Sequence, residues 1–228
     1  IPDVVSLEEA ATFATAEKYL SDEGITKLAG LNEDEITQLR NDYWDVVAKG
    51  GVNVCGQTFV DMDPLKGSAL PLIARIFPDA KVVIMHRDPR DVVWSCYRHN
   101  FIYSPTSYEF TSLSCAANHF CAMMNLIRRC VETMPLNVHI LSYEEIVRDF
   151  DNTTRALCSF LDLPWSSGLR EFDATARARA IRTASGSQVR QALFDGTGQW
   201  RRYERYMTPI LPLLEHWIIP SHLRDSRK

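Results

Sequence analysis

The stretch KVVIMHRDPRDVVWSCYRHNF, from Lys81 to Phe101, decides the fold, because an apolar run passes directly into a charged, helix-like run. Residues 81–86 are β-branched and nearly continuous in apolar character, which is typical of a strand buried in a parallel sheet. Asp88 and Pro89 then predict a helix start, with aspartate at the cap and proline in the first turn. A strand that leads straight into a helix indicates an α/β fold.

Segments on both sides of this stretch repeat the alternation of strand and helix. Short strands are predicted at 57–61 and 138–141. Helices are predicted from a capping box at Ser6–Glu9, after Asn32, at 68–77, 107–133, 143–147 and 153–161, and at 200–217 with interruptions at Pro209 and Pro212. No repeat or linker divides the chain, so we expect one domain over residues 1–228, with a parallel sheet flanked by helices.

Composition excludes several classes of protein. The 228 residues are 46% hydrophobic and carry a formal net charge of −4, which does not favour nucleic acid or an anionic membrane as a partner. No apolar run approaches the roughly 18 residues of a membrane span, and the first residues lack the basic leader of a signal peptide. Six cysteines without a C-x-x-C pair predict buried reduced thiols and no metal site. Reduced thiols favour a cytoplasmic location, and the Golgi lumen and the periplasm stay open as alternatives. The C-terminal PLLEHWIIP leaves a homodimer contact open, beside a role in the core.

Arg87 stands where the strand ends and the helix begins. Ligands of parallel sheets bind at the carboxyl ends of strands, and the following helix directs its N-terminal N–H groups to the same place. An arginine there can hold a phosphate with two parallel hydrogen bonds, and Ser95, two helical turns further on, can add a hydroxyl. The residues alone fit a second interpretation equally well, in which R-D-P-R-D forms local arginine–aspartate pairs and Ser95 packs against the sheet.

The segment FVDMDPLKGSALPLIARIFPDAKVVIMHRDPRDVVWSCYRHNF resembles the core of sulfotransferases that use 3′-phosphoadenylyl sulfate. The resemblance is to the branch with tyrosylprotein sulfotransferases and bacterial sulfotransferases fused to helical repeats. It implies a P-loop-NTPase-like sulfotransferase fold in which Arg87 and Ser95 bind the 3′-phosphate of the cofactor.

Two later segments extend the resemblance. LSYEEIVRDF resembles a strand followed by Tyr-Glu, which implies that Tyr143 lies near the adenine. RTASGSQVRQALFDGTGQWRRY resembles a late loop that closes over the nucleotide, which implies cofactor contacts from Ser185, Gln188 and Arg190. On the residues alone, Tyr143 fits a packed aromatic at a strand end, and the loop fits a solvated polar connection.

The sequence departs from the family pattern in three places. The family's N-terminal strand and its Gly-x-Pro-Arg-Ser-Gly-Thr-Thr loop, which cradles the 5′-phosphosulfate, are absent, as is the family's glutamate base. We expect that the sequence lacks that element by truncation. Met62 stands where the family has a sulfate-contacting lysine, and Lys66 is expected to be solvated. Gln199 replaces a basic residue, and His99, beside Arg98, replaces an arginine. No catalytic residue is therefore assigned.

The resemblance implies transfer of a sulfuryl group to a hydroxyl or amine of a small-molecule or protein acceptor. Two alternatives stay open: a catalytically silent module that binds through Arg87, and a nucleotide kinase of related architecture, which would need the absent Gly-Lys-Ser/Thr loop. The acceptor cannot be identified from the sequence, but the aromatic loop 101–110 leaves the helix that begins at the cofactor, so we expect it to border the acceptor cleft.

Overall fold

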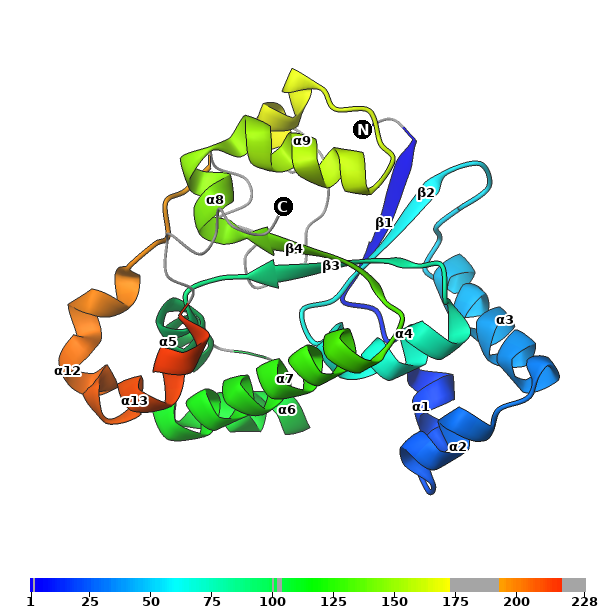
Figure 1. Cartoon of the computed structure of the whole chain (residues 1–228), viewed down its shortest axis with the longest axis horizontal. Helices are drawn as coiled ribbons and strands as arrows, with labels where there is room; N and C mark the ends of the chain where they lie inside the picture. The colour runs from blue at the N-terminus through cyan, green and yellow to red at the C-terminus, as the bar shows by residue number, and fades with distance from the viewer. Residues whose placement is uncertain (2, 100, 102–103, 173–192, 219–228) are drawn as a thin grey trace. The chain divides into compact units, whose positions relative to one another are not determined.

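The computed structural model describes residues 1–228 except 2, 100, 102–103, 173–192 and 219–228. The chain forms two compact units. The first comprises Ile1–Val82 and Leu126–Val138, and the second comprises Val83–Asn125 and His139–Lys228. Helices alternate with short strands along the chain, which confirms the predicted α/β class (Figure 1).

The elements of the first unit are β1 (Val4–Glu8), α1 (Ala14–Leu20), α2 (Gly24–Gly30), α3 (Glu33–Lys49), β2 (Thr58–Met62), the 3-10 helix η1 (Lys66–Ala69) and α4 (Leu70–Ile76). Three elements have residues in both units: β3 (Lys81–His86), α7 (Leu113–Thr133) and β4 (Asn137–Ser142). The second unit adds α5 (Pro89–Arg98), α6 (Pro105–Tyr108), η2 (Glu109–Thr111), α8 (Tyr143–Arg148), α9 (Phe150–Phe160), η3 (Ser167–Glu171), η4 (Gln199–Tyr203), α12 (Glu204–Met207), η5 (Thr208–Ile210), α13 (Leu211–Leu214) and η6 (Glu215–Trp217).

The N-terminal capping box predicted at Ser6–Glu9 is wrong. All of those residues except Glu9 belong to β1, which pairs in parallel with β2 from Val4 opposite Thr58 to Glu8 opposite Met62. The helix begins later, at Ala14, with Phe13 at its N-cap. The β-branched start of this segment suits a strand, and pairing with a distant strand overrides a local capping pattern.

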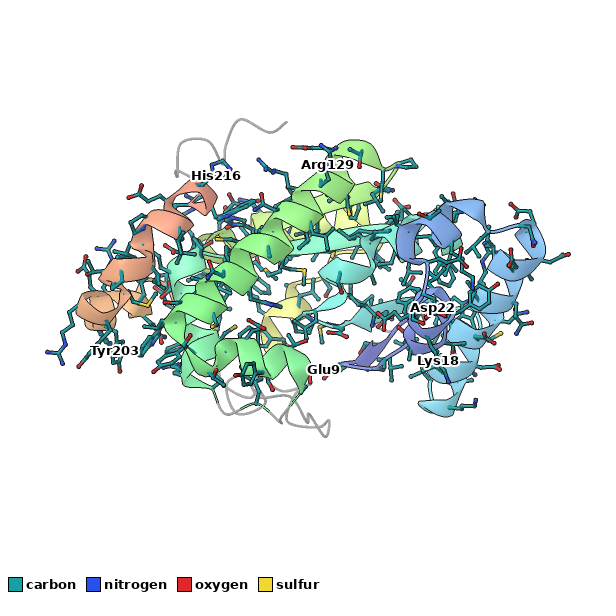
Figure 2. All side chains as sticks on the ribbon, turned by 90° about the horizontal axis from the view of Figure 1, so that it is seen from below. Glu9, Lys18, Asp22, Arg129, Tyr203 and His216 are labelled. Atoms are coloured by element: carbon teal, nitrogen blue, oxygen red, sulfur yellow. The ribbon has the colours of Figure 1, made fainter. Side chains whose placement is uncertain are left out.

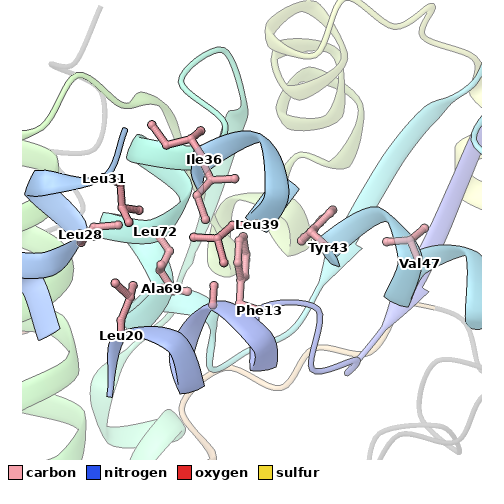
Figure 3. Close-up of a cluster of buried hydrophobic side chains, with 12 residues drawn as sticks. Phe13, Leu20, Leu28, Leu31, Ile36, Leu39, Tyr43, Val47, Ala69 and Leu72 are labelled. Atoms are coloured by element: carbon pink, nitrogen blue, oxygen red, sulfur yellow. The ribbon is translucent and has the colours of Figure 1, made fainter. Parts of the chain in front are cut away.

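The core of the first unit forms around α3, the helix predicted after Asn32. Asn32 accepts a hydrogen bond from the Glu35 N–H, and the Glu35 side chain accepts one from the Asn32 N–H, which completes a capping box. Figure 3 shows the buried cluster, in which α3 meets side chains of α1, α2 and α4. Its labelled members are Phe13, Leu20, Leu28, Leu31, Ile36, Leu39, Tyr43, Val47, Ala69 and Leu72.

Strands β3 and β4 form a second sheet and point the same way in Figure 1. The prediction of two buried strands is wrong in part. Met85 is 55% exposed, and Val83 and Ile140 are also exposed. Strand β3 therefore buries mainly the face with His86, whereas β4 buries Leu141 and Ser142, which lie on opposite faces.

A second core lies in the second unit and contains side chains of α5, α7 and the segment 200–214. Its buried members are Val93, Ala116, Ala117, Trp200, Met207, Ile210 and Leu214. The predicted helical segment 200–217 is a succession of short α- and 3-10 helices, as its prolines require. The helix predicted from residue 107 instead begins at Leu113, after α6 and η2. Figure 2 draws the described side chains and labels Tyr203, whose ring stacks on Trp94 with centroids 4.0 Å apart.

All six cysteines are free thiols, as predicted. Only Cys130 and Cys158 are buried, whereas Cys55 and Cys115 are exposed, so the prediction of uniformly buried thiols is wrong. Among the described helices, none is both long enough and apolar enough to cross a bilayer.

Candidate functional site

A polar pocket in the second unit lies where two strands end. Arg87 directly follows β3, and Tyr143 directly follows β4. Both residues therefore stand at the carboxyl ends of neighbouring strands, the place where parallel sheets bind ligands. The pocket is lined by Arg87, Asp91, Trp94, Ser95, Arg98, Tyr143, Phe194, Gly196 and Gln199.

Helix α5 contributes one continuous stripe to this pocket. Its four lining residues are Asp91, Trp94, Ser95 and Arg98. Their spacing of three, one and three residues places them on one helical face. The neighbouring His99 does not line the pocket, and its Nδ1 lies 2.8 Å from the Ser95 carbonyl oxygen.

The guanidinium of Arg87 is held in place by two contacts. Its Nη2 donates a hydrogen bond of 2.8 Å to the Gly196 carbonyl oxygen. Its central carbon lies 4.6 Å from the centroid of the Tyr143 ring, a cation–π contact. A fixed guanidinium loses less entropy when it binds an anion, so the site is preorganised.

Two N–H donors at the pocket lack an acceptor. Arg87 Nε and Trp94 Nε1 are both buried, and neither has a hydrogen-bond partner within the described part of the chain. Buried polar groups are normally paired, because desolvation without a partner is costly. A cationic donor, an indole donor and the Ser95 hydroxyl together suit an anionic ligand such as phosphate.

Residues 194–200, called the strap below, close one side of the pocket. The Tyr143 hydroxyl donates to the Phe194 carbonyl at 2.8 Å and accepts from the Gly196 N–H at 3.0 Å. Trp200, at the end of the strap, is buried in the second core. The strap is thus bound to the end of β4 and to the core that supports α5.

Asp91 fixes the far half of the strap to α5. It is 1% exposed, and its two oxygens accept the N–H groups of Gly198 at 2.6 Å and Trp200 at 2.9 Å. Burial raises the pKa of the Asp91 carboxyl, although the two N–H groups and the charge of Arg87 act in the opposite direction. Gly198 has φ +67°, a left-handed conformation that favours glycine.

An arginine–aspartate pair of the kind that the second interpretation expected is present at the start of α5. Asp88 caps the helix by accepting the Arg90 N–H, and its carboxylate is also paired with the Arg90 guanidinium at 2.6 Å. Burial acts to raise the pKa of Asp88, but the bonds from Arg90 outweigh it and lower that pKa. The local pair therefore forms with Arg90, while Arg87 lines the pocket.

The structure brings together Arg87, Ser95 and Tyr143 of the predicted cofactor residues. Ser185, Gln188 and Arg190 lie outside the described residues. Nucleotide binding by all six stays a prediction. Sequence reasoning missed Asp91 and Trp94, although their spacing from Ser95 at i−4 and i−1 could have placed them on its helical face.

The predicted acceptor loop 101–110 is described only in part. The rings of Phe101 and Phe110 lie 5.3 Å apart, and α6 begins within the loop at Pro105. A border with an acceptor cleft stays a prediction.

In the first unit, the prediction that Lys66 is solvated is wrong. Its side chain is only 15% exposed, and Nζ lies 2.5 Å from Asp61 Oδ1 and 3.2 Å from the Ala10 carbonyl oxygen. The other oxygen of Asp61 accepts the hydroxyls of Thr12 and Tyr43, each at 2.8 Å. Burial, followed by the charge of Asp61, strongly raises the pKa of Tyr43. The Lys66 ammonium is thus engaged in a structural network, while Met62, at the family lysine position, is 47% exposed.

Comparisons with known proteins agree with the resemblance. An uncharacterized protein of Aquifex aeolicus (strain VF5) is 31% identical over 178 residues, which cover 76% of this chain and 22% of that protein. Protein-tyrosine sulfotransferase 1 of Danio rerio is 24% identical over 173 residues, or 74% of this chain and 45% of that protein. The chain therefore spans less than half the length of either relative.

A solved structure and a family model also match this chain. The sulfotransferase domain from the curacin biosynthetic pathway aligns over 96% of this chain and 99% of its own, with a TM-score of 0.49 and 12% identity. The model of the Sulfotransferase family matches residues 5–167, more than half of the sequence. This chain belongs to the sulfotransferase family.

Proposed function

We propose that this chain binds 3′-phosphoadenylyl sulfate and transfers its sulfuryl group to a hydroxyl or amine of a small-molecule or protein acceptor. The observation that carries the proposal is the pocket at the ends of β3 and β4, in a member of the sulfotransferase family. There Arg87 and Ser95 are the proposed ligands of the 3′-phosphate, with Tyr143 beside the adenine.

The donor supplies an activated sulfuryl group. In the transfer, a bond forms between the sulfur and the acceptor oxygen or nitrogen, and the bond from sulfur to the bridging phosphate oxygen breaks. Adenosine 3′,5′-bisphosphate leaves with that electron pair, and the acceptor proton passes to a base. The described pocket contributes binding and orientation of the nucleotide, which can account for a large part of such an acceleration.

The Arg87 pocket fits the nucleotide half of this donor. The unpaired Arg87 Nε and Trp94 Nε1 are N–H donors, and the first turn of α5 adds the positive end of its dipole. The Tyr143 ring packs on the Arg87 guanidinium, and a flat aromatic face of this kind also suits a purine.

The test is calorimetric titration of adenosine 3′,5′-bisphosphate into the wild-type chain, Arg87→Ala and Arg202→Ala. Arg202 is exposed and does not line the pocket, so its replacement controls for the loss of one positive charge. We expect Arg87→Ala to weaken binding by about tenfold to a hundredfold, the usual range for a charge-assisted hydrogen bond. Arg202→Ala should bind as the wild type does. Failure of the folded wild-type chain to bind the bisphosphate would overturn the proposal.

A catalytically silent binding module is the second candidate. Met62 favours it, because methionine can neither transfer a proton nor neutralise developing charge, and Lys66 is paired with Asp61. Such a module would bind through Arg87 but transfer nothing. Assay of sulfuryl transfer separates the two candidates, since the wild-type chain transfers the group only if it is an enzyme. Met62→Lys, assayed beside it, tests whether the methionine limits the transfer.

A further inference from the structure

We propose that Arg98 is a second cationic ligand of the anion in this pocket and supplies the positive charge that Gln199 lacks. The inference rests on the proposed function, because it takes the anion to be the 3′-phosphate of the nucleotide. Its starting observation is that Arg98 lines the same pocket as Arg87, Ser95 and Gln199.

The position of Arg98 on α5 suits this role. It lies three residues after Ser95, on the pocket-facing stripe, at an axial distance of about 4.5 Å along the helix. Its side chain is exposed, and it forms no ion pair with a carboxylate of the described residues. A long side chain at this position can reach one helical turn back, toward Ser95, with its guanidinium.

The charge balance of the pocket favours a second cation. Arg87 carries one positive charge, but Asp91 brings a carboxylate into the same lining. Without Arg98 the two would cancel, and a phosphate monoester carries between one and two negative charges near neutral pH. With Arg98 the lining has a net positive charge, which favours an anion locally although the chain as a whole carries a formal net charge of −4.

Arg87 cannot offer all of its N–H donors to an anion. Its Nη2 already donates to Gly196, so part of its donor set is committed to the strap. Gln199, on the strap side of the pocket, can donate to an anion but carries no charge. Arg98 approaches from α5, which gives the anion cationic donors from two elements.

The experiment compares two ligands that differ only in the 3′-phosphate. Adenosine 3′,5′-bisphosphate and adenosine 5′-monophosphate are titrated into the wild type, Arg98→Ala, Arg98→Lys, Arg87→Ala and the control Arg202→Ala. We expect Arg98→Ala to weaken bisphosphate binding by about tenfold and to leave monophosphate binding unchanged. Arg98→Lys should retain most of the affinity, because the charge is kept. Thermal unfolding of each variant checks that the fold is intact.

A rescue variant tests whether Arg98 compensates for Gln199. Adding Gln199→Lys to Arg98→Ala should recover the bisphosphate affinity, because a cation returns to the opposite wall of the pocket. Wild-type bisphosphate affinity in Arg98→Ala, beside a loss in Arg87→Ala, would overturn the inference and leave the proposed function standing. Equal loss of both ligands would also overturn it, because Arg98 would then not distinguish the 3′-phosphate. If the wild type does not bind the bisphosphate, both proposals fall.

Discussion

Gly196 leaves little room for a side chain at the pocket. A Cβ at this position would lie 2.9 Å from the Tyr143 hydroxyl oxygen and 3.2 Å from Arg87 Nη2. Both are polar atoms bound to Gly196 itself, through its N–H and its carbonyl oxygen. A methyl group would therefore push apart the contacts that hold Arg87 and the strap.

We expect Gly196→Ala to lower the free energy of unfolding by about 1–3 kcal/mol and to weaken binding of adenosine 3′,5′-bisphosphate. The reason is that either the strap or the Arg87 side chain must move to admit the methyl group. Chemical denaturation measures the first effect, and calorimetry measures the second.

The matched control for this substitution is Gly168→Ala. The nearest atom to a Cβ at Gly168 is the Ser166 Oγ at 3.5 Å, an ordinary contact. This variant should bind nucleotide as the wild type does. Equal affinity for the bisphosphate in Gly196→Ala and the wild type would show that the strap can relax without disturbing Arg87.

At the scale of elements, the pocket depends on how the strap is fastened to α5. Asp91, in the first turn of α5, accepts hydrogen bonds from two N–H groups of the strap. Tyr143, at the start of α8, donates to the Phe194 carbonyl oxygen at the other end of the strap. The strap has no regular backbone pairing of its own before η4. Its geometry therefore depends on these side chains, and it should respond to the protonation of Asp91.

Asp91→Asn should remove a pH dependence of stability. The raised pKa of Asp91 means that, as pH rises from the unfolded value near 3.8 through the folded value, the folded chain retains this proton longer than the unfolded chain. The contribution of the group to stability therefore declines as pH rises through that range. We expect the difference in free energy of unfolding, wild type minus Asp91→Asn, to fall with rising pH in urea titrations.

Asp195→Asn provides a control of opposite sign within the same strap. The hydrogen bonds from the Thr197 side chain and backbone lower the pKa of Asp195, so its contribution is present at higher pH and is lost as pH falls. The corresponding difference should rise with pH. A wild-type-minus-Asp91→Asn difference that rises in the same way would contradict the assignment of Asp91.

At the scale of the whole molecule, each unit has its own core, and all described residues of the Arg87 pocket lie in the second unit. Ligands that bind the native state slow the opening of the structure around them. We expect adenosine 3′,5′-bisphosphate to slow hydrogen exchange at the strap amides of Gly196, Gly198 and Trp200. The amides of α3 serve as the internal reference.

Hydrogen exchange followed by mass spectrometry, with and without the nucleotide, measures this contrast. Arg87→Ala should abolish the added protection of the strap at the same nucleotide concentration. Protection that appears in α3 but not in the strap would contradict the assignment of the pocket to the second unit.

Much of the fold could be predicted because it depends on short-range patterns. The helix start after Asn32 and the Asp88–Pro89 start of α5 are each complete within a few residues. The Arg87 seam could be located in the same way, since a strand end and a helix start meet there. The capping pattern at Ser6 failed because β1 pairs with a strand more than fifty residues away.

The sequence by itself determined that the chain alternates strand and helix. It also determined that Arg87 lies between a strand and a helix and that Ser95 lies on that helix, because neighbouring residues set those features. Only the tertiary structure decided that Lys66 is turned inward onto Asp61 and that the strap closes the pocket. Gly198 and Trp200 meet Asp91 across 107 and 109 residues of chain. The partner that neutralises a charge or satisfies a buried N–H at that range is set by packing, which no local pattern encodes.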